Sequence, residues 1–387
     1  MWKSIASNAL TLFIVLLVAA AALVAWGRNE FTKPGPLAAT ICLRVESGAS
    51  LSGVSRNLEE RGAVSDARIF RIGADYSGRA QDLKFGSYLI QPGASMAAVL
   101  DTITAGGAST CGQEVNFRIG VASIDVVLRE LDPDTQQFVE VVKFDAGTEA
   151  PPEYLTATAE PDMRYNITIA EGATSWQIVE GLRKADFLSG EIAAVPPEGS
   201  LAPQTFEVAK GASRQELLDK MTALQAEILA RLWPERAADL PYDTPEKAMV
   251  MASIVEKETG IAEERALVAS VFINRLNAGM KLQTDPTVIY GITKGEGTLG
   301  RGLRQSELRR ETPYNTYVID GLPPTPIANP GEEAIRAALN PAQSDYVFFV
   351  AKTLNPADGH VFAVTLDEHN ANVEKLRALE AAAGGGD

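Results

Sequence analysis

Cysteine and histidine are scarce in this sequence, which has two of each among 387 residues. Two cysteines and two histidines do not make a zinc-binding pattern. His360 and His369 lie in no recognisable nucleophile motif, and no glycine-rich phosphate loop is present. These absences argue against Ser-His-Asp catalysis, and we predict neither a bound metal ion nor a cofactor.

Positive charge is also in short supply. The chain has 35 Lys and Arg against 50 Asp and Glu, for a formal net charge of -15. A nucleic-acid surface needs clustered Lys and Arg to neutralise phosphates, so we exclude nucleic acid as a partner. A hydrophobic fraction of 46% is typical of a globular chain, and the length allows roughly two or three domains.

The clearest physical signal is an uncharged apolar stretch at residues 9–26. As a helix it would extend about 27 Å, close to the hydrocarbon thickness of a bilayer. The alternative is a cleaved signal peptide, but the apolar core of such peptides is shorter, roughly 7–15 residues. We therefore predict a single transmembrane helix, with residues 1–8 in the cytoplasm and the large C-terminal part translocated.

A Pro-Gly-Pro linker at residues 27–40 precedes an internal repeat. Residues 48–50 (GAS) resemble 172–174 (GAT), and residues 88–95 (YLIQPGAS) resemble 206–213 (FEVAKGAS). Each copy predicts a strand, a helix capped by Ser or Thr, a second strand and a second helix. The predicted modules are residues 41–106 and 163–243, and the predicted fold class is α+β.

Residues 107–162, between the two modules, are acidic and rich in Thr, Pro and Ala towards their end. We expect an irregular insert with a few short strands, such as residues 137–144, and assign it no role. Cys42 and Cys111 bracket the first module and could pair in an oxidising compartment. Two unrelated buried thiols would explain them equally well.

Residues 244–387 have a different pattern and form the predicted catalytic domain. Thr244 and Pro245 are typical of a helix start, and residues 248–255 are apolar apart from Ser253, which predicts a buried helix. Gly260 suits the position just after its end. A second helix is expected at residues 263–278, strands at 346–350 and 361–365, and a terminal helix at 367–382.

Glu258 is the strongest candidate for catalysis. On a helix it shares a face with Met251 and Val255, which extends the buried stripe. It also lies in the last turn, where the helix dipole disfavours negative charge, and both effects would raise its pKa. Position alone also fits an ordinary exposed glutamate, and Glu256, which points elsewhere, fits an ion-pair partner for a Lys or Arg.

Two further segments carry residues suited to sugar binding. Gln283 and Thr284 could hydrogen-bond hydroxyls or amides, while Asp285 before Pro286 fits a helix N-cap. In the second segment, the Tyr314 ring could stack on a sugar face. Asn315 and Thr316 could bind hydroxyl or acetamido groups, and a purely structural role for this segment is equally compatible with its residue types.

The chain resembles the endolytic murein transglycosylases, the YceG-like or MltG family. The resemblance rests on residues 252–259 (ASIVEKET), 264–276 (ERALVASVFINRL) and 282–291 (LQTDPTVIYG), with YNTY, GLPP, IA and PG between 314 and 331. It is dense over residues 244–377. Upstream, residues 198–206 (EGSLAPQTF) are similar to a family motif that has Asp where this chain has Gln204. Any function that depends on the charge of that Asp is therefore not expected of Gln204.

This resemblance implies a lyase that cleaves the bond between N-acetylmuramic acid and N-acetylglucosamine within nascent strands, leaving 1,6-anhydro ends and ending strand elongation. Glu258 would act as acid and then base. The implied substrate-binding residues are Gln283, Thr284, Asp285, Tyr314, Asn315 and Thr316. The resemblance also implies a LysM-like module at residues 41–106, a location in the inner membrane with the catalytic part periplasmic, and peptidoglycan synthases of elongation or division as partners.

Two other functions remain open from the residues alone. Asp285 could serve as a second carboxylate beside Glu258, which would make the enzyme a hydrolytic muramidase. The repeated modules could instead belong to a non-catalytic peptidoglycan-binding scaffold. The chemistry of the products would distinguish a hydrolytic muramidase from a lyase. A Glu258→Gln variant that still replaces the wild type in cells would favour the non-catalytic scaffold.

Overall fold

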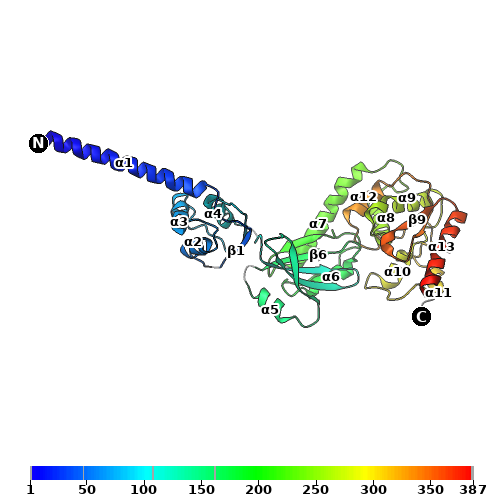
Figure 1. Cartoon of the computed structure of the whole chain (residues 1–387). Helices are drawn as coiled ribbons and strands as arrows, with labels where there is room; N and C mark the ends of the chain where they lie inside the picture. Colours follow the sequence, from blue (N-terminus) through cyan, green and yellow to red (C-terminus); the bar gives the residue numbers. More distant parts are fainter. Residues whose placement is uncertain (1, 47, 107–108, 161–162, 385–387) are drawn as a thin grey trace. The chain divides into compact units, whose positions relative to one another are not determined.

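The computed structural model describes residues 2–46, 48–106, 109–160 and 163–384 (Figure 1). The chain folds as two compact units. The first comprises Met1–Val115, Val127–Lys143 and Glu149–Arg164, and the second comprises Asn116–Val126, Phe144–Thr148 and Tyr165–Asp387. Helices and strands are both abundant, and the predicted α+β class is confirmed. The ends of the predicted insert, residues 107–108 and 161–162, lie outside the described residues.

The first unit begins with a long apolar helix, α1 (Trp2–Thr32), which extends beyond the predicted span at both ends. Within its segment Leu10–Thr32, an 18-residue stretch has a mean hydropathy of 2.5, and none of that stretch is buried. An apolar helical stretch without protein cover fits a single-pass membrane anchor. Near its end, the Phe31 ring packs against Gly73 so closely that a Cβ atom there would lie 2.3 Å from the ring.

The first module contains the predicted strand–helix–strand–helix pattern with one additional helix. Its elements are β1 (Ile41–Val45), α2 (Leu51–Glu60), α3 (Ala67–Tyr76), β2 (Gly86–Ile90) and α4 (Met96–Thr104). Strands β1 and β2 pair antiparallel, with Leu43 opposite Tyr88. Ser50 caps α2, as predicted, by accepting a hydrogen bond from the Gly53 backbone N–H. The helices and strands enclose one apolar core.

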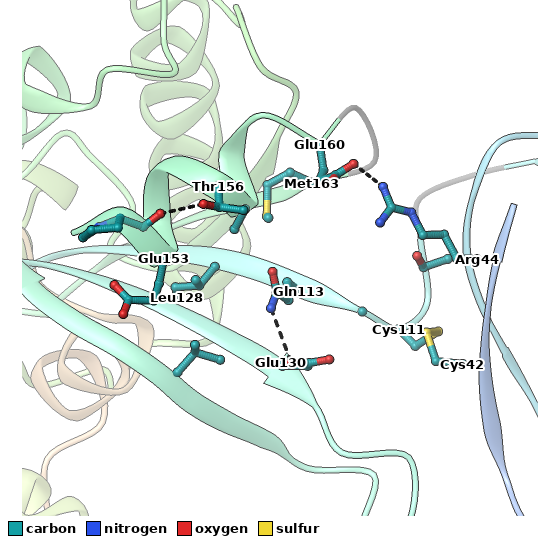
Figure 2. A pocket seen from close by; sticks show the side chains of 15 residues that line it. Cys42, Arg44, Cys111, Gln113, Leu128, Glu130, Glu153, Thr156, Glu160 and Met163 are labelled. Atoms are coloured by element: carbon teal, nitrogen blue, oxygen red, sulfur yellow. Dashed lines mark hydrogen bonds and ion pairs between the residues drawn. A yellow bond between two sulfur atoms is a disulfide. The ribbon is translucent and has the colours of Figure 1, made fainter. Parts of the chain in front are cut away.

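Cys42 and Cys111 form a disulfide, which decides between the two alternatives left by the sequence. It closes a loop with a sequence separation of 69, worth roughly 4 kcal/mol in the chain-entropy model. A cavity of about 680 Å³ lies beside it (Figure 2). Across this cavity Arg44 forms an ion pair with Glu160. The disulfide and the ion pair both tie β1 to the segment that follows the first module.

The insert has the few strands that were predicted, but it is more regular than expected. Residues 107–162 contain β3 (Gln113–Ile119), β4 (Ile124–Leu131), β5 (Phe138–Asp145) and α5 (Pro152–Thr158), and the strands form a sheet of order β5-β4-β3-β6-β7. Strand β3 was not predicted because two polar residues, Glu114 and Asn116, interrupt its apolar pattern. In the folded protein both are buried and have polar partners. Glu114 forms an ion pair with Arg129 (2.5 Å), and Asn116 accepts a hydrogen bond from the Thr168 hydroxyl (2.9 Å). The predicted strand at residues 137–144 is confirmed by β5.

The second module is confirmed as strand, helix, strand and helix. Its elements are β6 (Arg164–Ile169), α6 (Ser175–Lys184), β7 (Thr205–Val208) and α7 (Arg214–Leu232). Strands β6 and β7 pair antiparallel. Thr174 caps α6 through a capping box with Gln177, and Ser213 caps α7. The equivalent Ser and Thr positions of the repeat therefore act as helix caps in both modules.

The C-terminal part of the second unit is built around α8 (Pro245–Glu258), which packs against α9 (Arg265–Asn277) and α12 (Glu332–Leu339). Thr244 caps α8 and every residue from Ala248 to Val255 is buried, as predicted. Helix α12 was not predicted. The remaining elements are η1 (Trp233–Glu235), η2 (Ala262–Glu264), α10 (Asp285–Thr293), α11 (Gln305–Leu308), β8 (Phe348–Ala351), η3 (Pro356–Asp358), β9 (His360–Ala363) and α13 (Leu366–Gly384).

Candidate active site

Glu258 is the last residue of α8 and is half-buried. The helix ends there because Thr259 is extended (φ -144°, ψ 132°), and its hydroxyl accepts a hydrogen bond from the Ile261 N–H (3.1 Å). The position just after this cap is Gly260, as predicted. The carboxyl group is therefore attached to a rigid buried helix and lies at the helix end where the dipole opposes negative charge.

The loop before α10 brings a hydroxyl to this carboxyl group. Thr284 donates from its Oγ1 to Oε1 of Glu258. Its own backbone N–H is held by Oγ1 of Thr316 (3.1 Å), which also contacts the Thr287 hydroxyl (2.9 Å). All three threonines are almost completely buried. A buried network of hydroxyl groups thus fixes the Thr284 donor that reaches Glu258.

Burial is the largest cause that raises the pKa of Glu258. The hydrogen bond from Thr284 opposes this rise because it favours the charged form. The negative charge of Asp285 raises the pKa further, and the positive charges of His360 and Arg275 lower it. A carboxyl group with a raised pKa stays protonated to higher pH, which is what a general acid requires.

Asp285 is not the N-cap that the sequence suggested. The N-cap of α10 is Thr284, and Asp285 is the first residue of the helix. Pro286 occupies the next position, where its missing N–H leaves no donor unpaired. The exposed Asp285 carboxylate instead accepts a hydrogen bond from the Tyr317 hydroxyl (2.7 Å). Burial and this bond raise the pKa of Tyr317.

The remaining predicted residues divide into exposed and buried groups. Gln283 is exposed at the turn before Thr284, with a left-handed φ of 49°. Tyr314 is half-buried, its ring lies tilted against that of Tyr290 (ring centroids 5.1 Å apart), and its hydroxyl contacts the Thr325 hydroxyl. Asn315 is fully buried.

The Asn315 amide is used entirely by the protein. Its Nδ2 donates to the carbonyl groups of Glu307, Leu308 and Arg310, and its Oδ1 accepts from the Tyr317 N–H. Thr316 is likewise occupied by Thr284 and Thr287. These two side chains therefore support the loops from within, whereas Gln283 and Asp285 are exposed and Tyr314 is half-buried.

Arg275 is a site residue that the sequence analysis missed. It is 7% exposed and donates to the Leu282 and Val347 carbonyl groups, both at 2.6 Å. These bonds fix the loop that carries Thr284 and join it to the strand region of β8. The sequence did offer one indication of this role, a single arginine on an otherwise apolar helix face. A charge buried there needs specific polar partners.

Glu264 and His360 form a second pair that the sequence analysis missed. The Glu264 carboxylate accepts hydrogen bonds from both the backbone N–H (2.8 Å) and Nδ1 (2.9 Å) of His360. Gly359 permits this approach, since a Cβ atom there would lie 2.2 Å from the carboxylate. The two residues are 96 positions apart, so no local pattern indicated their pairing.

Among the described residues, no Lys or Arg forms the ion pair considered for Glu256, although the charges of Arg265 and Lys257 lower its pKa. Its Oε2 accepts a hydrogen bond from the Gly331 N–H (3.0 Å), at the N-terminus of α12. Burial raises the pKa of Glu256, and this bond opposes the rise. Within the described parts of the chain, no group of three or more His, Cys, Asp or Glu side chains is placed to hold a metal ion.

Comparison with known proteins agrees with these observations. A model of the YceG-like family matches residues 43–151 and 144–375. The endolytic murein transglycosylase of Bacillus subtilis (strain 168) is 28% identical over 339 residues, covering 87% of this chain and 84% of the relative. The endolytic murein transglycosylase of Streptococcus pneumoniae (strain ATCC BAA-255 / R6) is 27% identical over 340 residues, covering 86% of this chain and 58% of the relative.

Among solved structures, a yceG-like protein from Listeria monocytogenes is 26% identical, with a TM-score of 0.46. The match covers 86% of this chain and 98% of that one. The second segment matched by the family model contains every residue of the cluster around Glu258.

Proposed function

The chain belongs to the YceG-like family, and from this premise we propose that it is an endolytic murein transglycosylase, a lyase that cuts peptidoglycan strands internally. The observation that carries the proposal is the state of Glu258. Its carboxyl group is half-buried at the end of α8, has a raised pKa, and is hydrogen-bonded at one oxygen by Thr284.

The reaction needs one group that is first an acid and then a base. Protonated Glu258 donates to the oxygen that links C1 of N-acetylmuramic acid to N-acetylglucosamine, and the C1–O bond breaks. The resulting carboxylate then takes the proton of the muramoyl C6 hydroxyl, whose oxygen bonds to C1. Glu258 regains its proton, no water is consumed, and the muramoyl end is a 1,6-anhydro ring.

We propose distinct roles for the other predicted residues. Thr284 stabilises the carboxylate form of Glu258 by hydrogen bonding and thereby supports the second step. The exposed Gln283 and Asp285 and the half-buried Tyr314 contact the sugar chain. Asn315 and Thr316 position these residues through their buried hydrogen bonds.

The apolar helix α1 supports a location in the inner membrane. We propose that residues 244–387, the catalytic domain, lie on the periplasmic side, where nascent glycan strands are found, and that residues before the span remain in the cytoplasm. The Cys42–Cys111 disulfide supports this orientation, because disulfides persist in the periplasm. There the enzyme would end strand elongation beside the peptidoglycan synthases.

We also propose that residues 41–106 form a LysM-like module. Support comes from the order of β1, α2, α3 and β2, in which two helices connect a pair of antiparallel strands. Residues 163–243 form the second, related module, joined to the first by the strands of residues 107–162.

The test is digestion of uncrosslinked peptidoglycan by the full-length protein in detergent, with products identified by mass spectrometry. We expect products one water lighter than reducing-end muropeptides from the wild type and none from Glu258→Gln. Reducing-end products would replace this proposal with a hydrolytic muramidase that uses Asp285. A Glu258→Gln protein that still replaces the wild type in cells would favour a non-catalytic scaffold.

A further inference from the structure

A second hollow lies in the C-terminal part of the second unit, apart from the cluster around Glu258. Its volume is about 630 Å³. Neither Glu258 nor Thr284 nor Asp285 lines it. Its walls come from the first half of α8, the end of α9 and three loops: Pro197, Glu198, Pro241, Glu246, Lys247, Val250, Leu276, Gly321, Leu322, Pro323, Pro324, Thr325 and Pro326.

The walls combine apolar surface with charges of both signs. Prolines, Val250 and leucines provide rigid apolar surface. Lys247 and Glu246 are adjacent at the first turn of α8, and Lys247 is exposed apart from an ion pair with Asp243 (2.8 Å). Such a lining suits a ligand with methyl groups, a carboxylate and an ammonium group, rather than a sugar alone.

The carboxyl group of Glu198 is held rigidly at this hollow. Its Oε1 accepts hydrogen bonds from the Ser175 N–H (2.8 Å) and from Nδ2 of Asn329 (3.1 Å). Burial raises the pKa of Glu198. A fixed carboxyl group that is readily protonated is suited to hydrogen-bond a peptide amide.

The hollow and the candidate acid are connected by the same helix. Val250 and Glu258 are eight residues apart on α8, which corresponds to about 12 Å along the helix axis. The loop at the hollow is also bound to the site loop, because the Thr325 hydroxyl contacts the Tyr314 hydroxyl (2.8 Å). An extended peptide of about four residues would span this distance.

We propose that this hollow binds the stem peptide carried by the muramoyl residue whose glycosidic bond is cut. Lys247 pairs with a peptide carboxylate, Glu246 with the ammonium group of the diamino acid, and the proline walls contact alanine methyl groups. The inference rests on the proposed function, since it names a second part of the same substrate. It makes the enzyme selective for strands that still carry their peptides.

The experiment compares two substrates with the full-length protein in detergent: uncrosslinked strands with intact stem peptides, and the same strands after an amidase has removed them. The readout is the initial rate of 1,6-anhydro product formation. We expect the wild type to cleave the peptide-bearing strands about tenfold faster, the effect of one charge-assisted contact. Lys247→Glu should lower the rate on peptide-bearing strands more than the rate on denuded strands, and so remove most of this preference.

Two further variants complete the design. Pro324→Trp places a ring at the exposed rim of the hollow and should reduce the same preference without altering charge. Lys375→Glu makes the same charge change at an exposed position of α13 and should retain the preference. Thermal unfolding of each variant checks that the fold is retained.

The possible outcomes distinguish a failure of the peptide site from a failure of the proposed function. Equal rates of the wild type on both substrates would overturn the peptide site, as would variants that slow both substrates equally, which would indicate a sugar in the hollow. If the wild type forms no anhydro product from either substrate, the proposed function itself fails.

Discussion

Glu256 and Glu258 lie two residues apart on α8, and burial raises the pKa of both, yet they have different partners. Glu256 accepts a hydrogen bond from the Gly331 backbone N–H at the N-terminus of α12, where a helix dipole favours an anion. Glu258 lies at the C-terminus of its own helix, where the dipole disfavours one.

Burial raises the pKa of both carboxyl groups, so burial alone does not distinguish Glu258, the proposed catalytic residue, from Glu256. Glu256 has a fixed backbone donor and joins two helices, so its hydrogen-bonding capacity serves the fold. Glu258 accepts a hydrogen bond from the Thr284 hydroxyl at one oxygen, and in the proposed mechanism its carboxyl group acts on the substrate. The difference in partners, rather than in pKa direction, separates the two roles.

Of the substitutions that test this difference between the two glutamates, Glu258→Gln should have the largest effect on activity. We expect activity to fall by about 10³-fold, within the range typical of a lost general acid. The fold should be retained, because Gln keeps an oxygen for the Thr284 hydroxyl. A carboxyl group with a folded-state pKa above 4.5 destabilises the folded protein as pH rises past that value, so Gln should not lower stability at neutral pH.

This prediction is checked by product formation together with denaturant unfolding. Activity in Glu258→Gln close to that of the wild type would remove Glu258 from the mechanism. A marked loss of stability would assign it a structural role like that of Glu256.

Glu256→Ala should affect stability rather than chemistry. The change leaves the buried Gly331 N–H without its acceptor, and we expect a loss of about 2 kcal/mol in the free energy of unfolding. Activity per folded molecule should change little. Glu256→Gln, which keeps an acceptor oxygen, is the matched control and should lose less. Loss of activity without loss of stability would erase the distinction between the two glutamates.

Thr284→Val tests the hydrogen bond that Thr284 donates to Glu258. The hydrogen bond from Thr284 lowers the pKa of Glu258, so its removal raises that pKa and moves the alkaline limb of the pH–rate profile to higher pH. The carboxylate needed in the second step also loses stabilisation, and we expect about a tenfold lower rate at neutral pH. Thr284→Ser should restore both quantities, and a limb that moves to lower pH would contradict the assignment.

His360→Gln should have the smallest effect. When it is protonated, His360 lowers the pKa of Glu258, so its replacement should also move the alkaline limb to higher pH. We expect a change of about threefold in rate at neutral pH, because a single partly exposed charge acts weakly. The pH–rate profile of Glu264→Gln, which loses part of the clamp on His360, should move in the same direction by less.

Much of the fold was predictable from local signals. The cap at Thr244, the buried stripe from Ala248 to Val255 and the repeated helix caps depend on neighbours a few residues away. Strand β3 was missed because Glu114 and Asn116 interrupt its apolar pattern, and their burial depends on Arg129 and Thr168 from other strands. Helix α12 was missed within a stretch dominated by prolines.

The long apolar helix, the repeated order of strands and helices, the buried helix that ends at Glu258 and the family resemblance were all evident from residues close together in the chain. Tertiary packing was needed to pair Cys42 with Cys111, to bring Thr284 to Glu258 and to hold His360 against Glu264. These two kinds of feature differ in the sequence distance over which their interactions act. Helix caps and hydrophobic periodicity act between residues close in the chain, whereas each of these contacts joins segments that only packing brings together.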